Sequence, residues 1–554
     1  MTKAGPTNSL VCALLVDLYQ VTMTYAQWKA GKHEEMGVFE LFFRKNPFQG
    51  EFTVFCGLDE CLKHVEAFSF SSEDVAYLRS VPALAHCDPG FFEYLLGLDA
   101  SQVTVHALRE GTITFPRIPL LTIEAPIGLG QLLETTLLNL VNYPSLVATN
   151  AARMVVRASP IPCIEFGLRR AQGPDGACSA SKYSYIGGFM ATSNVQAGKL
   201  FQIPVAGTHA HSYVQAFTSL EEVQDCTLVH QQTQESQKFL PIVLQHRATL
   251  PTLVNTITTT NNNGSSSFTT NDGELASFVA YACAFPNSFL CLVDTYDTLQ
   301  SGLPNFVAVA LALEDFGYRP KGIRLDSGDL CALSNQCAAF FQTIAHATQR
   351  PNFRQFTIVA SNDINEQVLQ DLSTRQHSIT MFGIGTHLVT CQAQPALGCV
   401  YKLVEWQGRP RIKISQDSDK VTIPGRKKIF RIHGPDYSQP ILDLLLLAEE
   451  DDPVVGSPFL CRDPFQAHGR YSVVPSHVEP LQLPVFPIST AVPQSTLEES
   501  REFVQTQLLA MSKHTTSTIS NPGRYPVMVS QRLFDCLHEL WERDCPIQDI
   551  SKNS

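Results

Sequence analysis

Residues 161–173 read Ile-Pro-Cys-Ile-Glu-Phe-Gly-Leu-Arg-Arg-Ala-Gln-Gly, an apolar run that stops at Gly167 and is followed at once by Arg169 and Arg170. Five more short apolar segments also end in polar or charged residues, and they cover residues 203–212, 289–297, 322–329, 356–363 and 380–386. Helix-length amphipathic stretches separate them, a spacing typical of βα units around a parallel sheet. Because the carboxyl ends of parallel strands meet at one rim, where the βα loops converge, the pattern predicts a barrel-like α/β enzyme.

The chain divides into three regions. Residues 1–155 mix predicted helices and strands, residues 156–395 carry the βα alternation, and residues 396–554 contain a hairpin, a proline-rich stretch and a helical tail. The antiparallel elements at both chain ends predict a second, mixed α+β domain to which both ends contribute, with the hairpin around Gln407-Gly408 completing it. Residues 256–271 are rich in Thr, Asn and Ser, so they have little to bury and are predicted to form a disordered insert in one βα connection.

Composition narrows the class of protein. At 554 residues with 44% hydrophobic residues, the chain can bury two or three cores, and its net charge of -12 disfavours a nucleic-acid partner. The 16 cysteines are scattered without a Cys-x-x-Cys pair, as in proteins of a reducing compartment. The apolar run at 10–16 is interrupted by Asp17 and is too short for a signal peptide or a membrane span. We therefore expect a cytosolic enzyme with no membrane partner.

Two of the segments, 161–173 and 380–386, end in residues that are common in phosphate-binding sites. Gly383, Gly385 and Thr386 would let backbone amides close on phosphate oxygens at a helix start, although a purely structural glycine turn has the same pattern. Arg169 and Arg170 in the same array favour the phosphate reading. A ligand that carries phosphate is therefore expected near these two strand ends.

Residues 324–329 place an arginine and two carboxylates at another strand end. Asp326 and Asp329 can hold a metal–diphosphate complex or ribose hydroxyls, and Asp329 can equally cap a helix. Arg324 should share a face with Asp326 under strand alternation, and its planar fork suits a carboxylate ligand.

His209 and His211 allow three readings. They can form a metal pair as in barrel hydrolases, act as a nucleophile or acid–base group, or be satisfied polar residues. The segments at 289–297, 322–329 and 356–363 supply no further histidine, which disfavours the metal pair. His211 follows Gly207-Thr208 at the same rim as Arg169 and Asp326, so we favour a nucleophile or acid–base role.

These segments resemble the nicotinate phosphoribosyltransferase family. The matching stretches appear in order along the chain, and they are residues 17–20, 42–47, 133–143, 165–176, 324–330 and 382–402. The resemblance implies a type II phosphoribosyltransferase fold, an irregular α/β barrel with a mixed second domain. It also implies the reaction of nicotinate with phosphoribosyl diphosphate to nicotinate mononucleotide and diphosphate, stimulated by ATP hydrolysis, as the first step of NAD synthesis from nicotinate.

The resemblance also implies roles for particular residues. His211 matches a histidine that ATP phosphorylates, Tyr19, Thr208 and Arg324 match nicotinate contacts, and Thr386 matches a phosphoribosyl diphosphate contact. The family is typically a homodimer in which the residue matching Tyr19 crosses to the neighbouring active site. Mg²⁺ or Mn²⁺ would be bound through the diphosphate, with no direct protein ligand. The residues expected to contact the diphosphate substrate besides Thr386 are Gly383, Gly385, Arg169, Arg170, Asp326 and Asp329.

Two positions depart from the family pattern. His209 stands where the family often has an apolar residue, and Met190 stands where we expect an aspartate near the metal or ribose. Three alternative functions therefore remain at this point: a nicotinamide or quinolinate phosphoribosyltransferase, a metal-dependent barrel hydrolase using His209 and His211, and an inactive dimeric homologue. Arg324 favours a substrate with a single carboxylate.

Overall fold

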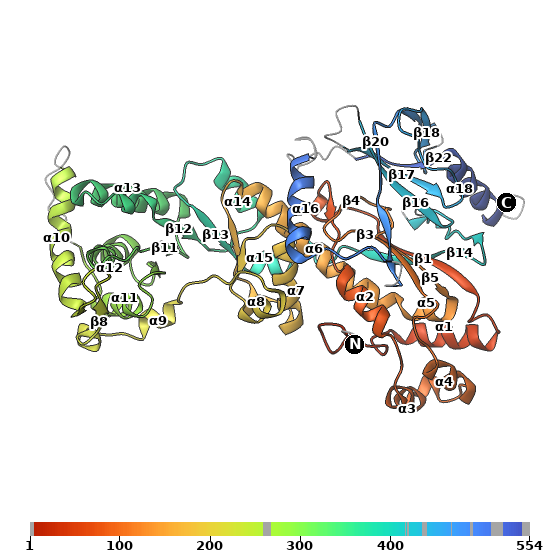
Figure 1. Ribbon diagram of the computed structural model, residues 1–554, viewed down its shortest axis with the longest axis horizontal. Helices are drawn as coiled ribbons and strands as arrows, with labels where there is room; N and C mark the ends of the chain where they lie inside the picture. The colour runs from red at the N-terminus through yellow and green to blue at the C-terminus, as the bar shows by residue number, and fades with distance from the viewer. Residues whose placement is uncertain are drawn as a thin grey trace, which may run out of the picture. The chain divides into compact units, whose positions relative to one another are not determined.

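The computed structural model describes residues 5–258, 268–415, 417, 420–434, 440–466, 468–487, 491–510 and 525–545 (Figure 1). The chain forms two compact units. The first comprises residues Met1–Ala152, Ile186–Gly188 and Cys391–Ser554, and the second comprises Arg153–Tyr185 and Phe189–Thr390.

The second unit is built on one parallel sheet of six strands. In spatial order these are β10 (Leu290–Leu292), β11 (Gly322–Leu325), β12 (Thr357–Ala360), β13 (Met381–Ile384), β6 (Cys163–Glu165) and β7 (Ala191–Thr192). Every neighbouring pair is parallel. The six strands form an all-parallel, half-barrel sheet, and the predicted α/β class with parallel strands is confirmed.

Helices alternate with these strands along the chain (Figure 1). They are α7 (Gly173–Ile186), α8 (Val195–Phe201), α9 (His211–Gln215), α10 (Leu240–Thr258), α11 (Asp272–Ala284), α12 (Leu303–Asp315), α13 (Leu330–Thr348), α14 (Glu366–Ser373) and α15 (Thr386–Val389). A small hairpin, β8 (Thr227–Val229) with β9 (Ser236–Lys238), lies between α9 and α10 in the sequence. α12 is buried from Leu303 to Leu313, which explains its almost continuous apolar sequence.

The expected strand at residues 203–212 is not present as a strand. Only one parallel bridge, Thr192 to Val205, extends the sheet here, and the chain then enters α9 at His211. Pro204 cannot donate to a ladder and Gly207 weakens a strand interior, so the pairing does not propagate.

The prediction of a disordered insert at 256–271 is wrong for the residues at both ends of that range, which are ordered. α10 continues to Thr258, Asn271 caps α11 by accepting the Glu274 N–H, and the Phe268 ring contacts Phe340 at 5.9 Å between centroids. Residues 259–267 lie outside the described residues. The prediction overlooked Phe268, an apolar side chain that can be buried.

The first unit contains an antiparallel sheet made from both ends of the chain. Its order is β15 (Arg409–Pro410), β14 (Cys399–Trp406), β1 (Met36–Phe43), β5 (Leu121–Pro126), β3 (Thr104–Leu108) and β21 (Gln482–Phe486). β14 and β15 form the hairpin expected around Gln407-Gly408 and pair with β1. The prediction of a mixed domain built from both chain ends is confirmed.

Helices and a short strand pair from the first part of the chain complete this part of the unit. They are α1 (Leu18–Lys29), α2 (Leu58–Ala67), α3 (Ser72–Ser80), α4 (Pro89–Leu96), α5 (Ile127–Leu132), α6 (Glu134–Ala158), β2 (Thr53–Val54) and β4 (Ile113–Thr114). The last residues of α6 belong to the other unit.

A further six-stranded sheet follows residue 427 and had no counterpart among the predicted elements. Its order is β19 (Arg470–Val473), β18 (Phe459–Arg462), β22 (Val527–Ser530), β17 (Pro440–Leu447), β16 (Lys427–His433) and β20 (His477–Pro480). The helical tail predicted for this region is two helices, α16 (Leu497–Ala510) and α18 (Gln531–Asp544), with β22 between them. α18 buries Leu533, Leu537 and Leu540, as an amphipathic helix does.

All 16 cysteines are free thiols. Within the described ranges, no helix combines the length and apolar character needed to cross a membrane.

Candidate active site

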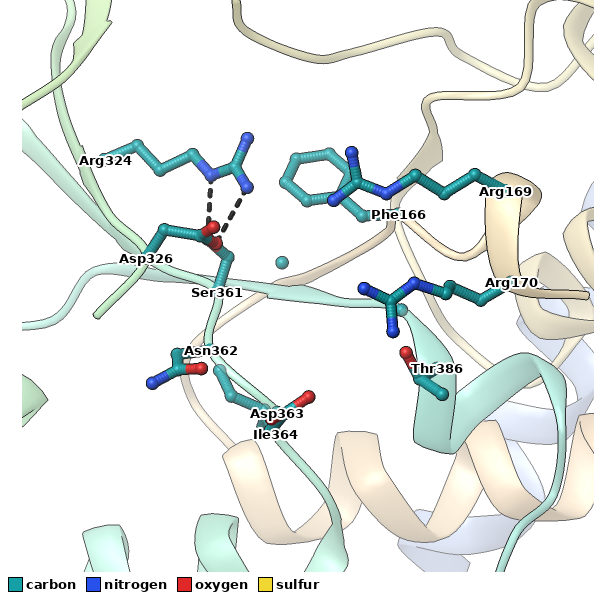
Figure 2. A pocket seen from close by; sticks show the side chains of 12 residues that line it. Phe166, Arg169, Arg170, Arg324, Asp326, Ser361, Asn362, Asp363, Ile364 and Thr386 are labelled. Atoms are coloured by element: carbon teal, nitrogen blue, oxygen red, sulfur yellow. Dashed lines mark hydrogen bonds and ion pairs between the residues drawn. The ribbon is translucent and has the colours of Figure 1, made fainter. Parts of the chain in front are cut away.

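A cavity of about 190 Å³ opens at the carboxyl ends of four neighbouring strands of the parallel sheet, β11, β12, β13 and β6 (Figure 2). Its lining is mostly polar and consists of Phe166, Arg169, Arg170, Arg324, Asp326, Ser361, Asn362, Asp363, Ile364, Gly383, Gly385 and Thr386. Seven of the residues predicted from the sequence are in this set: Arg169, Arg170, Arg324, Asp326, Gly383, Gly385 and Thr386. The strand-end pattern therefore located the cavity.

The cavity has a cationic group on each side. Arg169 and Arg170 reach it from the 3₁₀ turn Leu168–Arg170 after β6, and Arg324 reaches it from the opposite side with Asp326 (Figure 2). Arg169 and Arg170 are exposed to solvent, whereas the Arg324 side chain is only 13% exposed. A ligand with a negative group at each end fits this distribution of charge.

Gly383 and Gly385, at the end of β13, are required by packing. A Cβ on Gly383 would come within 2.4 Å of the Phe166 ring, and one on Gly385 within 3.1 Å of the Phe166 carbonyl oxygen. The structural reading of this turn is therefore observed: close packing of Phe166 against both glycines brings the ends of β6 and β13 to one wall of the cavity.

Glu165, the last residue of β6, stabilises the turn that follows this strand. The fully buried carboxylate accepts hydrogen bonds from the Gly167 N–H, the Ser181 hydroxyl at 2.9 Å and the Thr192 hydroxyl. These bonds hold the turn from which Arg169 and Arg170 project. Sequence analysis quoted Glu165 as part of a matching stretch but gave it no role.

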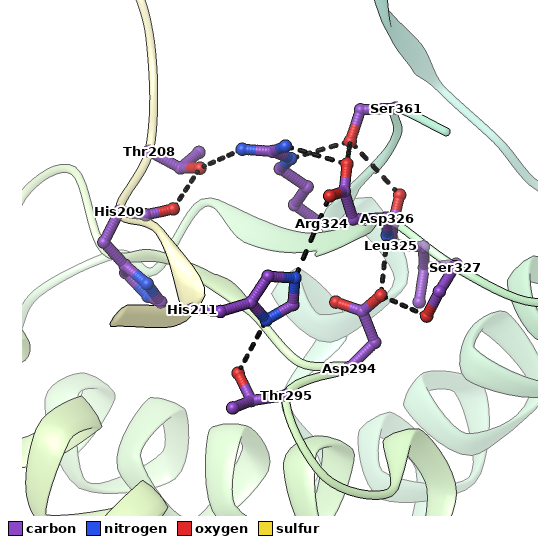
Figure 3. Close-up of polar contacts among 10 residues, drawn as sticks. All are labelled: Thr208, His209, His211, Asp294, Thr295, Arg324, Leu325, Asp326, Ser327 and Ser361. Carbon is purple, nitrogen blue, oxygen red and sulfur yellow. Dashed lines mark hydrogen bonds and ion pairs between the residues drawn. The ribbon is translucent and has the colours of Figure 1, made fainter. Parts of the chain in front are cut away.

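Arg324 is held at three of its nitrogens (Figure 3). Nε donates to the Ser361 hydroxyl at 2.7 Å, Nη1 to the Thr208 hydroxyl at 3.2 Å, and Nη2 to Asp326 Oδ1 at 2.8 Å. The guanidinium also lies 5.2 Å from the centre of the Phe166 ring. Arg324 and Asp326 do share a face of the strand, as alternation predicted, and Thr208 joins them.

Because a guanidinium has five N–H groups, two of those on Arg324 have no protein partner among the described residues. The arginine is fixed in position and still has donors available for a carboxylate.

His211 is the first residue of α9 and lies beside this network (Figure 3). Nδ1 is 3.1 Å from the Thr295 hydroxyl, and Nε2 is 3.8 Å from Asp326 Oδ2. Its side chain is 39% exposed, so the imidazole can be reached from solvent.

Asp294 supports the turn that carries Asp326. Its Oδ2 accepts the Asp326 backbone N–H at 3.0 Å and the Ser327 hydroxyl at 2.5 Å. Sequence analysis assigned no role to Asp294, Thr295 or Ser361, although all three follow β-strands in segments that it identified. Applying the strand-end rule to every segment would have found them.

His209 differs from His211 in its surroundings. It is 9% exposed, its ring contacts Tyr213, Phe278 and Tyr281, and its Nε2 accepts the Leu292 N–H at 3.4 Å. Burial lowers the pKa of His209 to about 4, so the imidazole is neutral at pH 7. His209 is therefore a packed residue, and in the part of the chain that the structure describes no group of three or more His, Cys, Asp or Glu side chains has a metal-binding arrangement.

Three other predicted or noted residues do not line the cavity. Asp329 caps α13 by accepting the Cys331 and Ala332 N–H groups and pairs with Arg375 at 3.1 Å. Tyr19 lies on α1 in the other unit. Met190 is 40% exposed just before β7, where its N–H donates to the Cys163 carbonyl. The capping role weighed for Asp329 is the one observed.

Comparison with known proteins gives consistent matches along the chain. Residues 14–142 match the model for the nicotinate phosphoribosyltransferase N-terminal domain, 161–433 the nicotinate phosphoribosyltransferase family, and 426–537 the C-terminal domain. The nicotinate phosphoribosyltransferase of Caenorhabditis elegans is 48% identical over 98% of this chain and 96% of its own length. Nicotinate phosphoribosyltransferase 1 of Arabidopsis thaliana is 46% identical over 99% and 97%. A crystal structure of human nicotinic acid phosphoribosyltransferase aligns with TM-score 0.82 and 41% identity, covering 95% of this chain and all of that one.

Proposed function

Because the chain belongs to the nicotinate phosphoribosyltransferase family, we propose that its cavity joins nicotinate to phosphoribosyl diphosphate, giving nicotinate mononucleotide and diphosphate with ATP hydrolysis. The observation that supports this most directly is the pair of opposed cationic groups in one cavity, Arg324 on one side and Arg169 with Arg170 on the other. One group suits a carboxylate and the other a diphosphate.

At the Arg324 side we place the acid. The fork keeps two N–H groups for the pyridine carboxylate, while Thr208, Ser361 and Asp326 hold its orientation. An amide substrate has one carbonyl oxygen and one NH₂ group. Because NH₂ is itself a donor, it cannot accept from the second Arg324 N–H, and that N–H would stay unpaired. This arrangement favours nicotinate over nicotinamide.

At the opposite side we place the diphosphate, against Arg169, Arg170 and the Gly383–Thr386 turn. When the bond from the anomeric carbon to diphosphate breaks, negative charge develops on the departing oxygen and the ribose gains oxocarbenium character. The pyridine nitrogen forms the new bond to that carbon as the diphosphate departs. Guanidinium groups already in position stabilise the charge on the diphosphate, and holding the two substrates in the reacting orientation lowers the barrier further. Asp329 is left out of this set because it is bound to the start of α13 and to Arg375.

We expect the double variant Arg169→Gln with Arg170→Gln to raise the KM for phosphoribosyl diphosphate at least about tenfold, since each lost charge-assisted bond is worth about 1.5–3 kcal/mol. The KM for nicotinate should change little, because Arg324 is untouched. Steady-state kinetics with each substrate varied in turn measures both constants. A matched change in the two KM values would contradict this placement of the diphosphate.

Mg²⁺ or Mn²⁺ is proposed to enter with the diphosphate. No direct protein ligand is proposed for the ion, which the diphosphate would carry into the cavity past the carboxylates of Asp326 and Asp363. The ion would neutralise part of the diphosphate charge.

His211 is proposed as the residue that ATP phosphorylates. A ring nitrogen attacks the γ-phosphorus, the bond to the β-phosphate oxygen breaks, and ADP leaves; water later takes the phosphoryl group as inorganic phosphate and restores the imidazole. The half-exposed ring at the edge of the network can accept this group, whereas the buried His209 cannot be reached.

We also propose a homodimer in which Tyr19 serves the neighbouring active site. Three apolar side chains are exposed on α1: Leu18 at 48%, Tyr19 at 44% and Met23 at 39%. An exposed apolar helix surface of this kind is a common feature of a protein–protein interface. Tyr19 is not among the residues that line the cavity of its own chain. In the proposed dimer, each cavity therefore receives Tyr19 from the second copy of the chain.

The double variant Leu18→Glu with Met23→Glu should be monomeric at concentrations where the unmodified protein is dimeric, as measured by sedimentation velocity. Tyr77→Glu is the matched control, because Tyr77 is 61% exposed on α3 and should leave the dimer intact. Mixing Tyr19→Ala with His211→Asn chains should restore activity, since a shared arrangement gives one complete site per mixed dimer. Absence of restoration, with mixed dimers demonstrated, would contradict site sharing.

One assay tests the proposed reaction as a whole. The purified chain is supplied with phosphoribosyl diphosphate, Mg²⁺ and either nicotinate, nicotinamide or quinolinate, with and without ATP. We expect mononucleotide from nicotinate only, faster with ATP. No product from any of the three substrates would support the inactive homologue. The 16 free cysteines support the proposal that the enzyme works in the cytosol.

A further inference from the structure

Arg169 and Arg170 are placed at the diphosphate, but their own side chains do not fix them. Both are exposed to solvent, and neither guanidinium has a hydrogen-bond or ion-pair partner in the part of the chain that the structure describes. Arg324, on the other side of the cavity, is instead bound at three of its nitrogens. The positions of Arg169 and Arg170 therefore depend on the backbone of the turn that carries them, Leu168–Arg170.

The orientation of this turn is set by Gly167, the residue before it. The Gly167 N–H donates to Glu165 Oε1, and the Gly167 carbonyl accepts the Arg170 N–H at 2.8 Å. Val389 packs so closely against Gly167 that a Cβ there would come within 2.2 Å of Val389 Cγ1. The Glu165 carboxylate and this packing therefore hold the peptide group from which the two arginines continue.

Glu165 is itself held by a buried network of polar side chains. Glu165 is fully buried, and Ser181, Thr192 and Asn194 are each 1% exposed. Glu165 Oε2 accepts the Ser181 hydroxyl at 2.9 Å and the Thr192 hydroxyl. Asn194 donates through Nδ2 to Ser181 Oγ at 3.2 Å and through its backbone N–H to the Thr192 hydroxyl oxygen at 2.9 Å, and it also caps α8. The network thus connects the end of β6 with α7, β7 and the start of α8.

The Glu165 carboxylate depends on this network, because a buried charge is stable only with hydrogen-bond donors around it. The Gly167 N–H satisfies Oε1, and the two hydroxyls satisfy Oε2. Without the hydroxyls, Oε2 would be buried without a donor, so the carboxylate would turn toward its remaining donor or take up a proton. Either response changes the bond to Gly167 and moves the turn.

We propose that Glu165, held by Ser181 and Thr192, is a positioning residue for the diphosphate: it orients Arg169 and Arg170 without touching the ligand. This inference rests on the proposed binding of diphosphate at these two arginines. Glu165, Ser181 and Thr192 are not among the residues that line the cavity. They act on the ligand only through the turn.

The arginine at the opposite side of the cavity is held independently of this network. Its hydrogen bonds go to Thr208, Ser361 and Asp326. Phe166, whose ring centre lies 5.2 Å from the Arg324 guanidinium, is bound through its own N–H, which donates to the Ile384 carbonyl at 2.8 Å. A change in the network should therefore affect diphosphate binding and leave nicotinate binding as it is.

The test is equilibrium binding to the full chain, with phosphoribosyl diphosphate plus Mg²⁺ and with nicotinate in separate titrations. The double variant Ser181→Ala with Thr192→Val keeps nearly the same shape and removes both hydroxyls from Glu165 Oε2. We expect the Kd for phosphoribosyl diphosphate to rise about tenfold, the effect of roughly one hydrogen bond to a charged group, and the Kd for nicotinate to stay unchanged. An equal rise of both Kd values would overturn the proposal, because general damage to the fold would then explain the result.

Two further variants separate lost hydrogen bonds from a disturbed core. Thr192→Ser keeps the hydroxyl, so both Kd values should match those of the unmodified protein. Ser184→Ala is the matched control, because Ser184 is 1% exposed on the same helix as Ser181 and its hydroxyl donates to the Ser181 carbonyl at 3.3 Å. A rise in either variant as large as that of the double variant would contradict the proposal. If the double variant does not fold, Thr192→Val alone should raise the Kd for phosphoribosyl diphosphate about threefold, and an unchanged value would refute the positioning role.

A double-mutant cycle shows whether the network acts through the arginines. In the background of Arg169→Gln with Arg170→Gln, loss of the two hydroxyls should cause no further rise in the Kd for phosphoribosyl diphosphate. An undiminished rise in that background would mean that the network acts through other groups, and the positioning role would be wrong. If the arginine variant itself binds phosphoribosyl diphosphate as tightly as the unmodified protein, the placement of the diphosphate is wrong. Tight binding by the hydroxyl variant alone overturns only the positioning role.

Discussion

His211→Asn is expected to abolish both the transfer of the γ-phosphate of ATP to the protein and the stimulation of the reaction by ATP. The amide cannot form a stable phospho-adduct, and the remaining groups of the cavity are untouched, so slow ATP-independent synthesis should persist. His211 is half-exposed at the first residue of α9, and the variant should fold normally. The measurement is incorporation from γ-labelled ATP, with a product that is labile in acid and stable in base, alongside rates with and without ATP.

His209→Leu is the matched control for this experiment. It should keep the label, because His209 is packed against three aromatic rings and a leucine fills a similar apolar space. The variant loses the weak bond from the Leu292 N–H, so a loss of stability of about 1–3 kcal/mol is expected. Label on His209 in place of His211 would refute the assignment, since that ring would have to leave its pocket to react.

Arg324→Ala should raise the KM for nicotinate far more than the KM for phosphoribosyl diphosphate. Removing one partner of a hydrogen-bonded ion pair costs about 2–5 kcal/mol, which corresponds to about 30-fold to 4,000-fold. Part of that cost comes from Asp326 and Ser361, which lose their shared partner. Steady-state kinetics with each substrate varied separately gives the two constants.

Two variants show whether the fork or only the charge matters. Arg324→Lys keeps the charge without the planar fork, so it should recover only a part of the affinity for nicotinate. Arg375→Ala removes an arginine that is 53% exposed and pairs with Asp329 outside the cavity, and it should change neither constant. An equal rise of both KM values in Arg324→Ala would mean that Arg324 binds diphosphate or supports the fold.

Local regularities in the sequence were sufficient for the parallel sheet. The side chains of a strand alternate between its two faces, and each strand stops where glycines, charged residues and helix caps begin. The residues that end β6, β11, β12 and β13 could therefore be located along the chain. The same period predicted that Arg324 and Asp326 share a face, and they do. These features depend on a few neighbouring residues and need no knowledge of the rest of the fold.

The sheet after residue 427 escaped sequence analysis for the opposite reason. β17 pairs in parallel with β22, a strand far along the chain that lies between two helices, and β16 pairs with both β17 and β20. The strands are short and some contain proline, so each is a weak signal alone. Burial of Phe430, Leu444 and Cys461 in one core stabilises them together.

By itself, the sequence determined which residues stand at the strand ends, and therefore that cations, carboxylates and a histidine share one rim. Only the tertiary structure decided which of them touch: Asp326 meets Arg324 and His211, whereas Asp329, three residues later, turns to α13 and Arg375. The physical reason is that each contact is made across strands or loops that are distant in sequence. Its geometry depends on the order in which β10, β11, β12, β13 and β6 pair, and on the packing that buries His209 and leaves His211 accessible.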